Sequence, residues 1–173
     1  MYIGLPKQDS CCRLGEVMDI SATRFLQRKH YDSKDLYDQA APLLNLKGGT
    51  LSVDDSVLDK PYSHYLAFVG YFWSGKHHRT VKGINLITLY STDTHGQHLP
   101  INFRVYDKSE GKTKNDYFQD MLDEVLAWGL EPAMVTGDSW YSGVDNLKRI
   151  KNHQLGWLFA LESNRTVSLE KGQ

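Results

Sequence analysis

The stretch Leu51-Ser52-Val53-Asp54-Asp55-Ser56 decides the fold that the sequence predicts. Leu51 and Val53 alternate with small or acidic residues, and this period of two is typical of a β-strand that buries one face. The strand is expected to end on the adjacent carboxylates of Asp54 and Asp55. An unpaired carboxylate loses its hydration when it is buried. The acidic pair therefore predicts either a bound cation or exposure at a cleft.

A second apolar run stops on an acid in the same way. It is Ala133-Met134-Val135-Thr136-Gly137-Asp138. If the two strands lie side by side, Asp54 and Asp138 meet at one edge of the sheet. Magnesium prefers carboxylate oxygens and retains waters, so two such aspartates can hold it with room left for a substrate phosphate. The two runs together predict a divalent-metal site, suited to in-line displacement at phosphorus.

Length and composition favour one domain, or one domain with a small helical appendage. The 173 residues are 40% apolar and include 6 Phe, 10 Tyr and 4 Trp, enough for a packed core. The formal net charge is −1, so any nucleic-acid surface must be local. The two cysteines, Cys11 and Cys12, are adjacent, which argues against a zinc site or disulfide framework and fits a reducing compartment. No segment has the pattern of a membrane span or signal peptide, so a soluble, cytoplasmic protein is expected.

The residues between the two acidic strands predict an antiparallel meander followed by a helix. Strands are expected at 84–90 and 99–106, joined by a turn, and the acidic strand can add to the edge of this hairpin. A helix should follow, capped by Asn115 or Asp116, with one apolar stripe. Its acids are interpreted as a solvated face rather than as ligands. They are Asp120, Asp123 and Glu124.

After the second acidic strand, a helix capped by Ser142 and a buried strand at 156–161 complete the pattern. A strand, a crossover helix and a strand form a right-handed unit that makes the Asp138 strand parallel to its neighbour. The predicted class is α/β, a ribonuclease-H-like mixed sheet with flanking helices. Ligands in such sheets collect at the carboxyl ends of the strands, where both acids are expected.

Residues 1–47 are predicted to be a helical appendage, and residues 48–173 the catalytic core, incomplete at its C-terminal end. Two short helices are expected in the first 30 residues, the second carrying Arg24, Arg28 and Lys29. This arrangement is compatible with a remnant of a helix-turn-helix module that contacts DNA. An ordinary helical pair with solvated basic residues is the favoured alternative, because the segment lacks the usual third helix of such a module.

A local basic surface is predicted between the acidic strand and the hairpin. An aromatic run at 68–73 precedes a segment rich in positive charge, a composition suited to contacting phosphates and stacking on bases. The alternative is a solvated loop. The candidate DNA-binding residues are Lys76, His77, His78, Arg79 and Lys82. The two adjacent histidines lack the spacing of a usual zinc site, so no metal role is assigned to them.

Three motifs resemble DDE-type transposases of bacterial insertion sequences. They are LSVDDSVLDKPYS at 51–63, YFWSGKHHRTVKG at 71–83 and VTGDSWYS at 135–142. The resemblance is to the group whose ribonuclease-H-like core carries an inserted β-domain before its last catalytic acid. It implies that Asp54 and Asp138 are catalytic metal ligands, with Asp55 as a neighbour or substitute for Asp54.

The same resemblance implies a cofactor and partners. Such enzymes bind the terminal inverted repeats of their element as double-stranded DNA, nick it with Mg²⁺ or Mn²⁺ and join the 3′ ends to target DNA, usually as homodimers. Their third acid is a glutamate in a Tyr-x-x-Arg-x-x-x-Glu pattern, which this sequence lacks. Glu162 and Glu170 are poor substitutes, because neither stands in a helical stripe.

The sequence is therefore expected to be a truncated and inactive transposase that binds metal weakly. Without a closing helix, one face of the sheet should expose apolar surface. The alternative is a non-catalytic DNA-binding remnant that pairs with full-length transposase and interferes with it. A third reading is a metal nuclease of the same fold that acts on structured nucleic acid.

Overall fold

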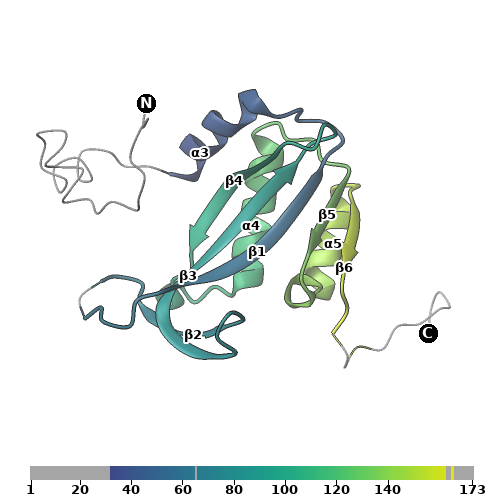
Figure 1. Ribbon diagram of the computed structural model, residues 1–173. Coiled ribbons are helices and arrows are strands. Elements are labelled where there is room, and N and C mark those ends of the chain that lie inside the picture. The colour runs from purple at the N-terminus through teal and green to yellow at the C-terminus, as the bar shows by residue number, and fades with distance from the viewer. Residues whose placement is uncertain (1–31, 65, 163–164, 166–173) are drawn as a thin grey trace, which may run out of the picture. The chain divides into compact units, whose positions relative to one another are not determined.

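The central strand of the sheet is β1 (Thr50–Asp59), which lies between β3 (Arg79–Thr92) and β5 (Met134–Gly137) in the computed structural model (Figure 1). The structure describes residues 32–64, 66–162 and 165. Leu51 and Val53 are 0% and 2% exposed, which confirms the predicted strand with one buried face. β1 does not end at Asp54 and Asp55 as predicted. It runs on to Asp59 because β3 is long enough to pair with it throughout.

The described strands form one mixed sheet of six. The order is β2 (Gly70–Ser74), β3, β1, β5, β6 (Gly156–Phe159), and β4 (His98–Val105) pairs with the other half of the β3 edge that β2 occupies. The predicted meander of β1, β3 and β4 and the parallel pairing of β5 with β1 are confirmed. β2 was not expected as a strand. It forms because the aromatic run alternates, with Phe72 buried and its neighbours outside.

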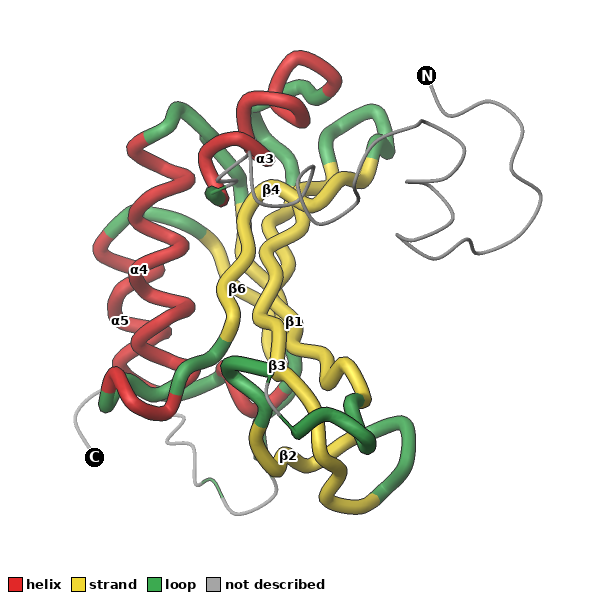
Figure 2. Tube along the Cα trace, turned by 90° about the vertical axis from the view of Figure 1, so that its left-hand side faces the viewer, coloured by secondary structure: helices red, strands yellow, loops and turns green. Residues whose placement is uncertain are grey.

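Two helices cover one face of the sheet, as Figure 2 shows. They are α4 (Lys114–Ala127) and α5 (Val144–Asn152). The apolar stripe predicted for α4 is confirmed, since five of its six members are at most 4% exposed and the sixth, Leu126, is partly buried. The five are Tyr117, Phe118, Met121, Leu122 and Val125.

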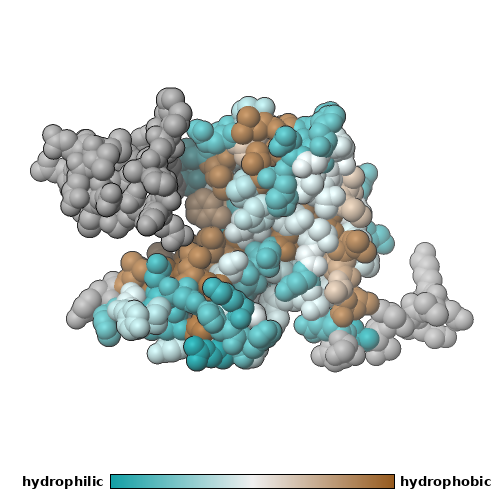
Figure 3. Space-filling model, in the orientation of Figure 1, coloured by the Kyte–Doolittle hydropathy of each residue, from teal (hydrophilic) through white to brown (hydrophobic). Residues whose placement is uncertain are grey.

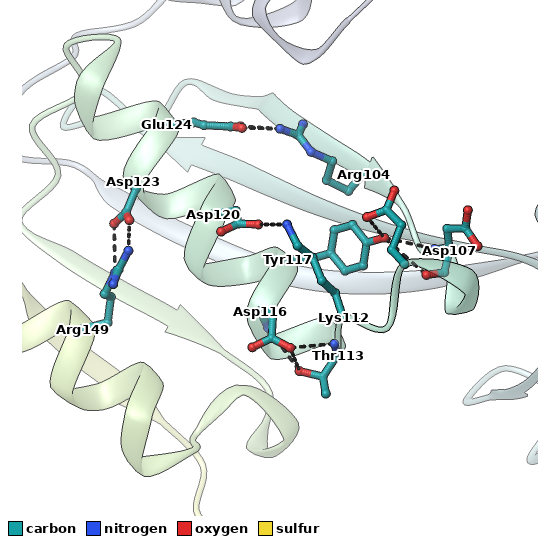
Figure 4. A network of polar contacts seen from close by, with 11 residues as sticks. Arg104, Asp107, Lys112, Thr113, Asp116, Tyr117, Asp120, Asp123, Glu124 and Arg149 are labelled. Atoms are coloured by element: carbon teal, nitrogen blue, oxygen red, sulfur yellow. Dashed lines mark hydrogen bonds and ion pairs between the residues drawn. The ribbon is translucent and has the colours of Figure 1, made fainter.

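Both predicted helix caps are wrong. The N-cap of α4 is Thr113, which receives a hydrogen bond from the Asp116 amide while the Asp116 carboxylate accepts from Thr113 (Figure 4). This capping box satisfies two backbone donors at once, which neither predicted cap position can do. α5 begins after Gly143 without a side-chain cap, because the Ser142 hydroxyl donates instead to the Ser139 carbonyl.

Helix α3 (Ser33–Ala40) and the short 3₁₀ helix η1 (Ala41–Leu43) pack with the sheet. The compact unit that contains the sheet begins at Ser33. Tyr37 is 3% exposed, and its ring lies 5.2 Å from that of Trp128 at the end of α4. The division into an appendage at 1–47 and a core at 48–173 stays a prediction, and the helix-turn-helix candidate lies outside the described residues.

The last strand was predicted to be buried, and this is wrong. Trp157 and Leu158 are 45% and 65% exposed, and within β6 only Phe159 is buried. β6 pairs with β5 alone among the described strands, so it is an edge strand. Figure 3 views the sheet from the side opposite α4 and α5, where apolar residues lie among hydrophilic ones. No helix in the described part of the chain is long and apolar enough to cross a bilayer.

Candidate active site

The two acids that end the predicted motifs lie next to each other across the β1–β5 pairing. The parallel register runs from Thr50 opposite Met134 to Val53 opposite Gly137. The next residue on each chain segment is Asp54 and Asp138. β5 stops there because the Asp138 carboxylate accepts a hydrogen bond from the Trp140 amide, 2.9 Å away, and starts the 3₁₀ helix η3 (Ser139–Tyr141). The fold thus brings together two aspartates that are far apart in sequence.

These aspartates open into a pocket of about 630 Å³. Both side chains are exposed. The pocket removes part of the water around the Asp54 carboxylate, which raises its pKa; the Asp55 amide opposes this, while the charges of Asp55 and Asp138 add to it. The lining residues are Asp54, Asp55, Ser56, Val57, Trp73, Ser74, Gly75, Lys76, Lys114, Asp138 and Trp140. A cation bound between the carboxylates would relieve their repulsion.

Asp55 has a different environment, because successive side chains of a strand point to opposite faces. One of its oxygens accepts hydrogen bonds from Lys114 Nζ at 2.6 Å and from Asn85 Nδ2 at 2.8 Å. The other accepts from the Tyr141 hydroxyl at 3.3 Å. Its side chain is 16% exposed. With both oxygens occupied by protein donors, Asp55 is less suited than Asp54 to hold a metal ion.

Tyr141 belongs to this buried network. It is 0% exposed, and burial together with the negative charges of Asp55 and Asp138 raises the pKa of its hydroxyl far above the ordinary value. The group therefore stays protonated and acts as a hydrogen-bond donor. Sequence reasoning missed Lys114, Asn85 and Tyr141 as partners of the acidic strand. One signal was present, since Asn85 is a polar residue at an inward position of an apolar strand.

The acids of α4 do not reach the pocket. Figure 4 shows Asp120, Asp123 and Glu124 each with a basic partner, while Asp116 pairs with Thr113. Glu124 pairs with Arg104, Asp123 with Arg149 and His153, and Asp120 with Lys112. Burial raises the pKa of Asp123, but the hydrogen bonds from Arg149 and His153 outweigh it and leave the pKa lowered. These contacts agree with the interpretation that the helix acids are not ligands, although they are paired and only partly solvated.

The five basic candidates lie at the β2–β3 hairpin, but they are divided between two surfaces. Lys76 lines the acidic pocket. His77, Arg79 and Lys82 line a second pocket of about 280 Å³. His77 pairs with Asp59 at 2.7 Å, and Lys82 donates to the Ser63 carbonyl at 2.5 Å. His78 occupies the turn, with φ of 48°.

Comparison with known proteins agrees with this geometry. Residues 21–172 match the family described as DDE superfamily endonuclease. The chain belongs to this family. That membership confirms the predicted likeness to DDE enzymes, while an origin in a bacterial insertion sequence stays a prediction.

Solved structures of other proteins are similar in fold to this DDE superfamily endonuclease. A piggyBac transposase synaptic complex with hairpin DNA is 15% identical, with a TM-score of 0.50, over 92% of this chain and 39% of that one. This likeness confirms the ribonuclease-H-like fold. A Drosophila P element transposase strand transfer complex matches at 9% identity and a TM-score of 0.29, over 89% of this chain and 38% of that one. The chain thus spans about two fifths of the length of either transposase. No curated protein sequence matches it.

DDE superfamily endonucleases use divalent metal ions. Two residues of this chain are suited to bind such an ion. Asp54 and Asp138 each accept a single hydrogen bond, from a backbone amide, among the residues described. Each therefore retains a carboxylate oxygen for a hard cation. Within 32–64, 66–162 and 165, no group of three or more His, Cys, Asp or Glu residues could hold a metal. Glu162 does not line the pocket.

Proposed function

We propose that this chain carries the catalytic core of a DNA transposase that cleaves and transfers strands at insertion-sequence ends with Mg²⁺ or Mn²⁺. One observation carries the proposal. In a member of the DDE family, Asp54 and Asp138 occupy the next register positions beyond the parallel β1–β5 pairing and face a common pocket. That is the place where ligands collect in sheets of this type.

In this proposal Asp54 and Asp138 are the metal ligands. A bound divalent ion would supply Lewis-acid stabilisation of the phosphate that is attacked. Asp55 holds Lys114 at the pocket wall, so its role is to position that ammonium rather than to bind metal. Lys114 then provides a fixed positive charge toward a phosphate that enters the pocket.

The DNA partner is proposed to lie across the β2–β3 hairpin. Lys76 lines the pocket with the acids, while His77, Arg79 and Lys82 line the second pocket of the hairpin and His78 lies in its turn. Such contacts to phosphates give affinity without sequence information. We propose double-stranded DNA, both element ends and target, as the substrate, a homodimer as the working assembly and the bacterial cytoplasm as the place of action.

A second candidate function follows from the count of acids. The described pocket has two free carboxylates, whereas a two-metal site needs further charge to hold both ions. We propose that these 173 residues alone do not cut DNA. A non-catalytic form that binds DNA and pairs with a full-length transposase would then interfere with transposition.

Metal binding tests the proposed site. The electron paramagnetic resonance signal of Mn²⁺ should report weak binding to the wild-type chain, and Asp54→Asn or Asp138→Asn should lower the affinity on the order of tenfold or more. Asp145→Asn is the matched control, because the Asp145 side chain is 88% exposed and lies on α5. Equal Mn²⁺ affinity in all four proteins would contradict the site.

Cleavage of supercoiled plasmid with Mg²⁺ separates the two candidates. No nicking, combined with reduced excision when this chain is co-expressed with a full-length transposase, supports the non-catalytic form. Robust nicking that Asp138→Ala abolishes would show that the chain is a complete enzyme. Cleavage confined to RNA–DNA hybrids would favour a structured-nucleic-acid nuclease instead.

A further inference from the structure

Two exposed tryptophans line the pocket that contains the acids. Trp73 comes from β2 and Trp140 from η3, which are far apart in the chain. They are 65% and 55% exposed. Large aromatic surface is usually removed from water, so two such rings at one small opening need an explanation.

Local structure determines the exposure of both rings. In β2, side chains alternate, so that Phe72 is buried while Trp73 projects outward. Trp140 is held at the start of η3, where its amide binds the Asp138 carboxylate, and Lys114 Nζ lies 5.9 Å from the centre of its ring. The same contacts that build the acidic site therefore fix Trp140 beside it.

Exposure alone is not sufficient to assign a role. Trp157 is also exposed, at 45%, yet it lies on the edge strand β6 and does not line the pocket. Trp73 and Trp140 differ from Trp157 in the side chains around them. They share the pocket with three carboxylates and with Lys76 and Lys114. Aromatic groups beside cationic ones are the combination that binds unpaired nucleotides.

We infer that Trp73 and Trp140 stack an unpaired nucleobase next to the phosphodiester held at Asp54 and Asp138. The inference rests on the proposed function, and it specifies the substrate as DNA with an unpaired or frayed nucleotide at the reacting position. Stacking on an indole tolerates any base, because every base has a π-face. Lys76 and Lys114 neutralise the adjoining phosphates.

The test uses the full chain in EDTA, so that it does not depend on metal or cleavage. Two duplexes of one sequence are compared by fluorescence anisotropy, one fully paired and one with a single unpaired 2-aminopurine. The wild-type chain should bind the second more tightly and quench its 2-aminopurine. Trp73→Leu and Trp140→Leu should each weaken that binding on the order of 5- to 100-fold and leave binding of the paired duplex unchanged.

Three further proteins make the result decisive. Trp157→Leu should behave as wild type, and Trp73→Phe, which keeps an aromatic ring, should retain most of the preference. Asp145→Asn, outside the pocket, should also keep the preference. Because EDTA removes the metal from every sample, failure of the metal chemistry is distinguishable from failure of the stacking. Equal binding of both duplexes by wild type, equal weakening of both by the leucine variants, or no binding of either would overturn the inference.

Discussion

Two adjacent aspartates of strand β1 lie on opposite sides of the strand and have opposite environments. On one side, Asp54 faces Asp138 across an exposed pocket, and partial loss of hydration, to which the charges of Asp55 and Asp138 add, raises its pKa. On the other, Asp55 is enclosed by three donors from β3, α4 and η3. We refer to Asp54 and Asp138 as the open acids.

The acids of α4 extend the second pattern. We refer to Asp55, Asp123 and Glu124 as the paired acids, since each has a cationic partner within its own compact unit. Paired acids stabilise the folded chain when they are ionised. Ionised open acids lower its stability, and a bound cation can restore it. The partners of an aspartate, more than its place in a motif, determine whether it is available to a metal ion.

The largest difference in stability is expected between alanine substitutions of the adjacent residues Asp54 and Asp55. Asp55→Ala should lower the free energy of unfolding by about 3 kcal/mol, because it leaves the buried Asn85 amide and the partly buried Lys114 ammonium without an acceptor. Asp54→Ala should change it by less than about 0.5 kcal/mol, as surface substitutions usually do. Urea denaturation of the two variants measures both values. Equal losses would mean that Asp54 and Asp55 do not differ as the contacts indicate.

Removal of the Glu124 carboxylate should lower the free energy of unfolding by an amount between those expected for Asp55→Ala and Asp54→Ala. Its carboxylate accepts from Arg104 at 2.6 Å and from the buried Asn102 at 3.0 Å. Glu124→Ala should cost about 2 kcal/mol, less than the Asp55 variant because this pair is more exposed. Mn²⁺ affinity should stay at the wild-type value. A loss of affinity without unfolding would place Glu124 among the metal ligands and break the division into open and paired acids.

Much of this fold could be predicted from local pattern. The alternation at Leu51 and Val53, the stripe of α4 and the strand–helix–strand order each reflect one physical period, and the structure confirms them. Their convergence at Asp54 and Asp138 follows from parallel pairing. Helix starts were predicted less well, because Asn115 and Asp116 are good caps in isolation while the capping box selects Thr113.

The parts that failed depend on contacts between distant segments. The motif favours Asp54 over Asp55 as a ligand without showing why, and the physical difference comes from Asn85, Lys114 and Tyr141, which later elements supply to Asp55. The extension of β1 to Asp59 required the early start of β3 at Arg79, in a segment rich in charge. The exposure of β6 reflects its edge position, which an apolar run cannot reveal.

The smallest effects concern pH and have opposite signs. A raised pKa means that the folded chain favours protonated Asp54, so ionisation above the ordinary Asp range lowers stability. Asp54→Asn should then be slightly stabilising at neutral pH, by less than about 1 kcal/mol, since the group is exposed. The gain should vanish as pH falls below about 3.9, where both states are protonated.

Asp123 should show the reverse dependence. Its lowered pKa means that ionisation stabilises the folded chain above the ordinary Asp range, and this contribution is lost as pH falls through the lowered pKa. Asp123→Asn should therefore cost about 0.5 kcal/mol at neutral pH and little in acid. Thermal melts of the two variants against wild type, from acid to neutral pH, measure the two curves. Added Mn²⁺ should reverse the sign for Asp54→Asn and leave Asp123→Asn unchanged, because only the open acid gives up a ligand. Parallel curves for the two variants would show that the pocket does not separate these aspartates.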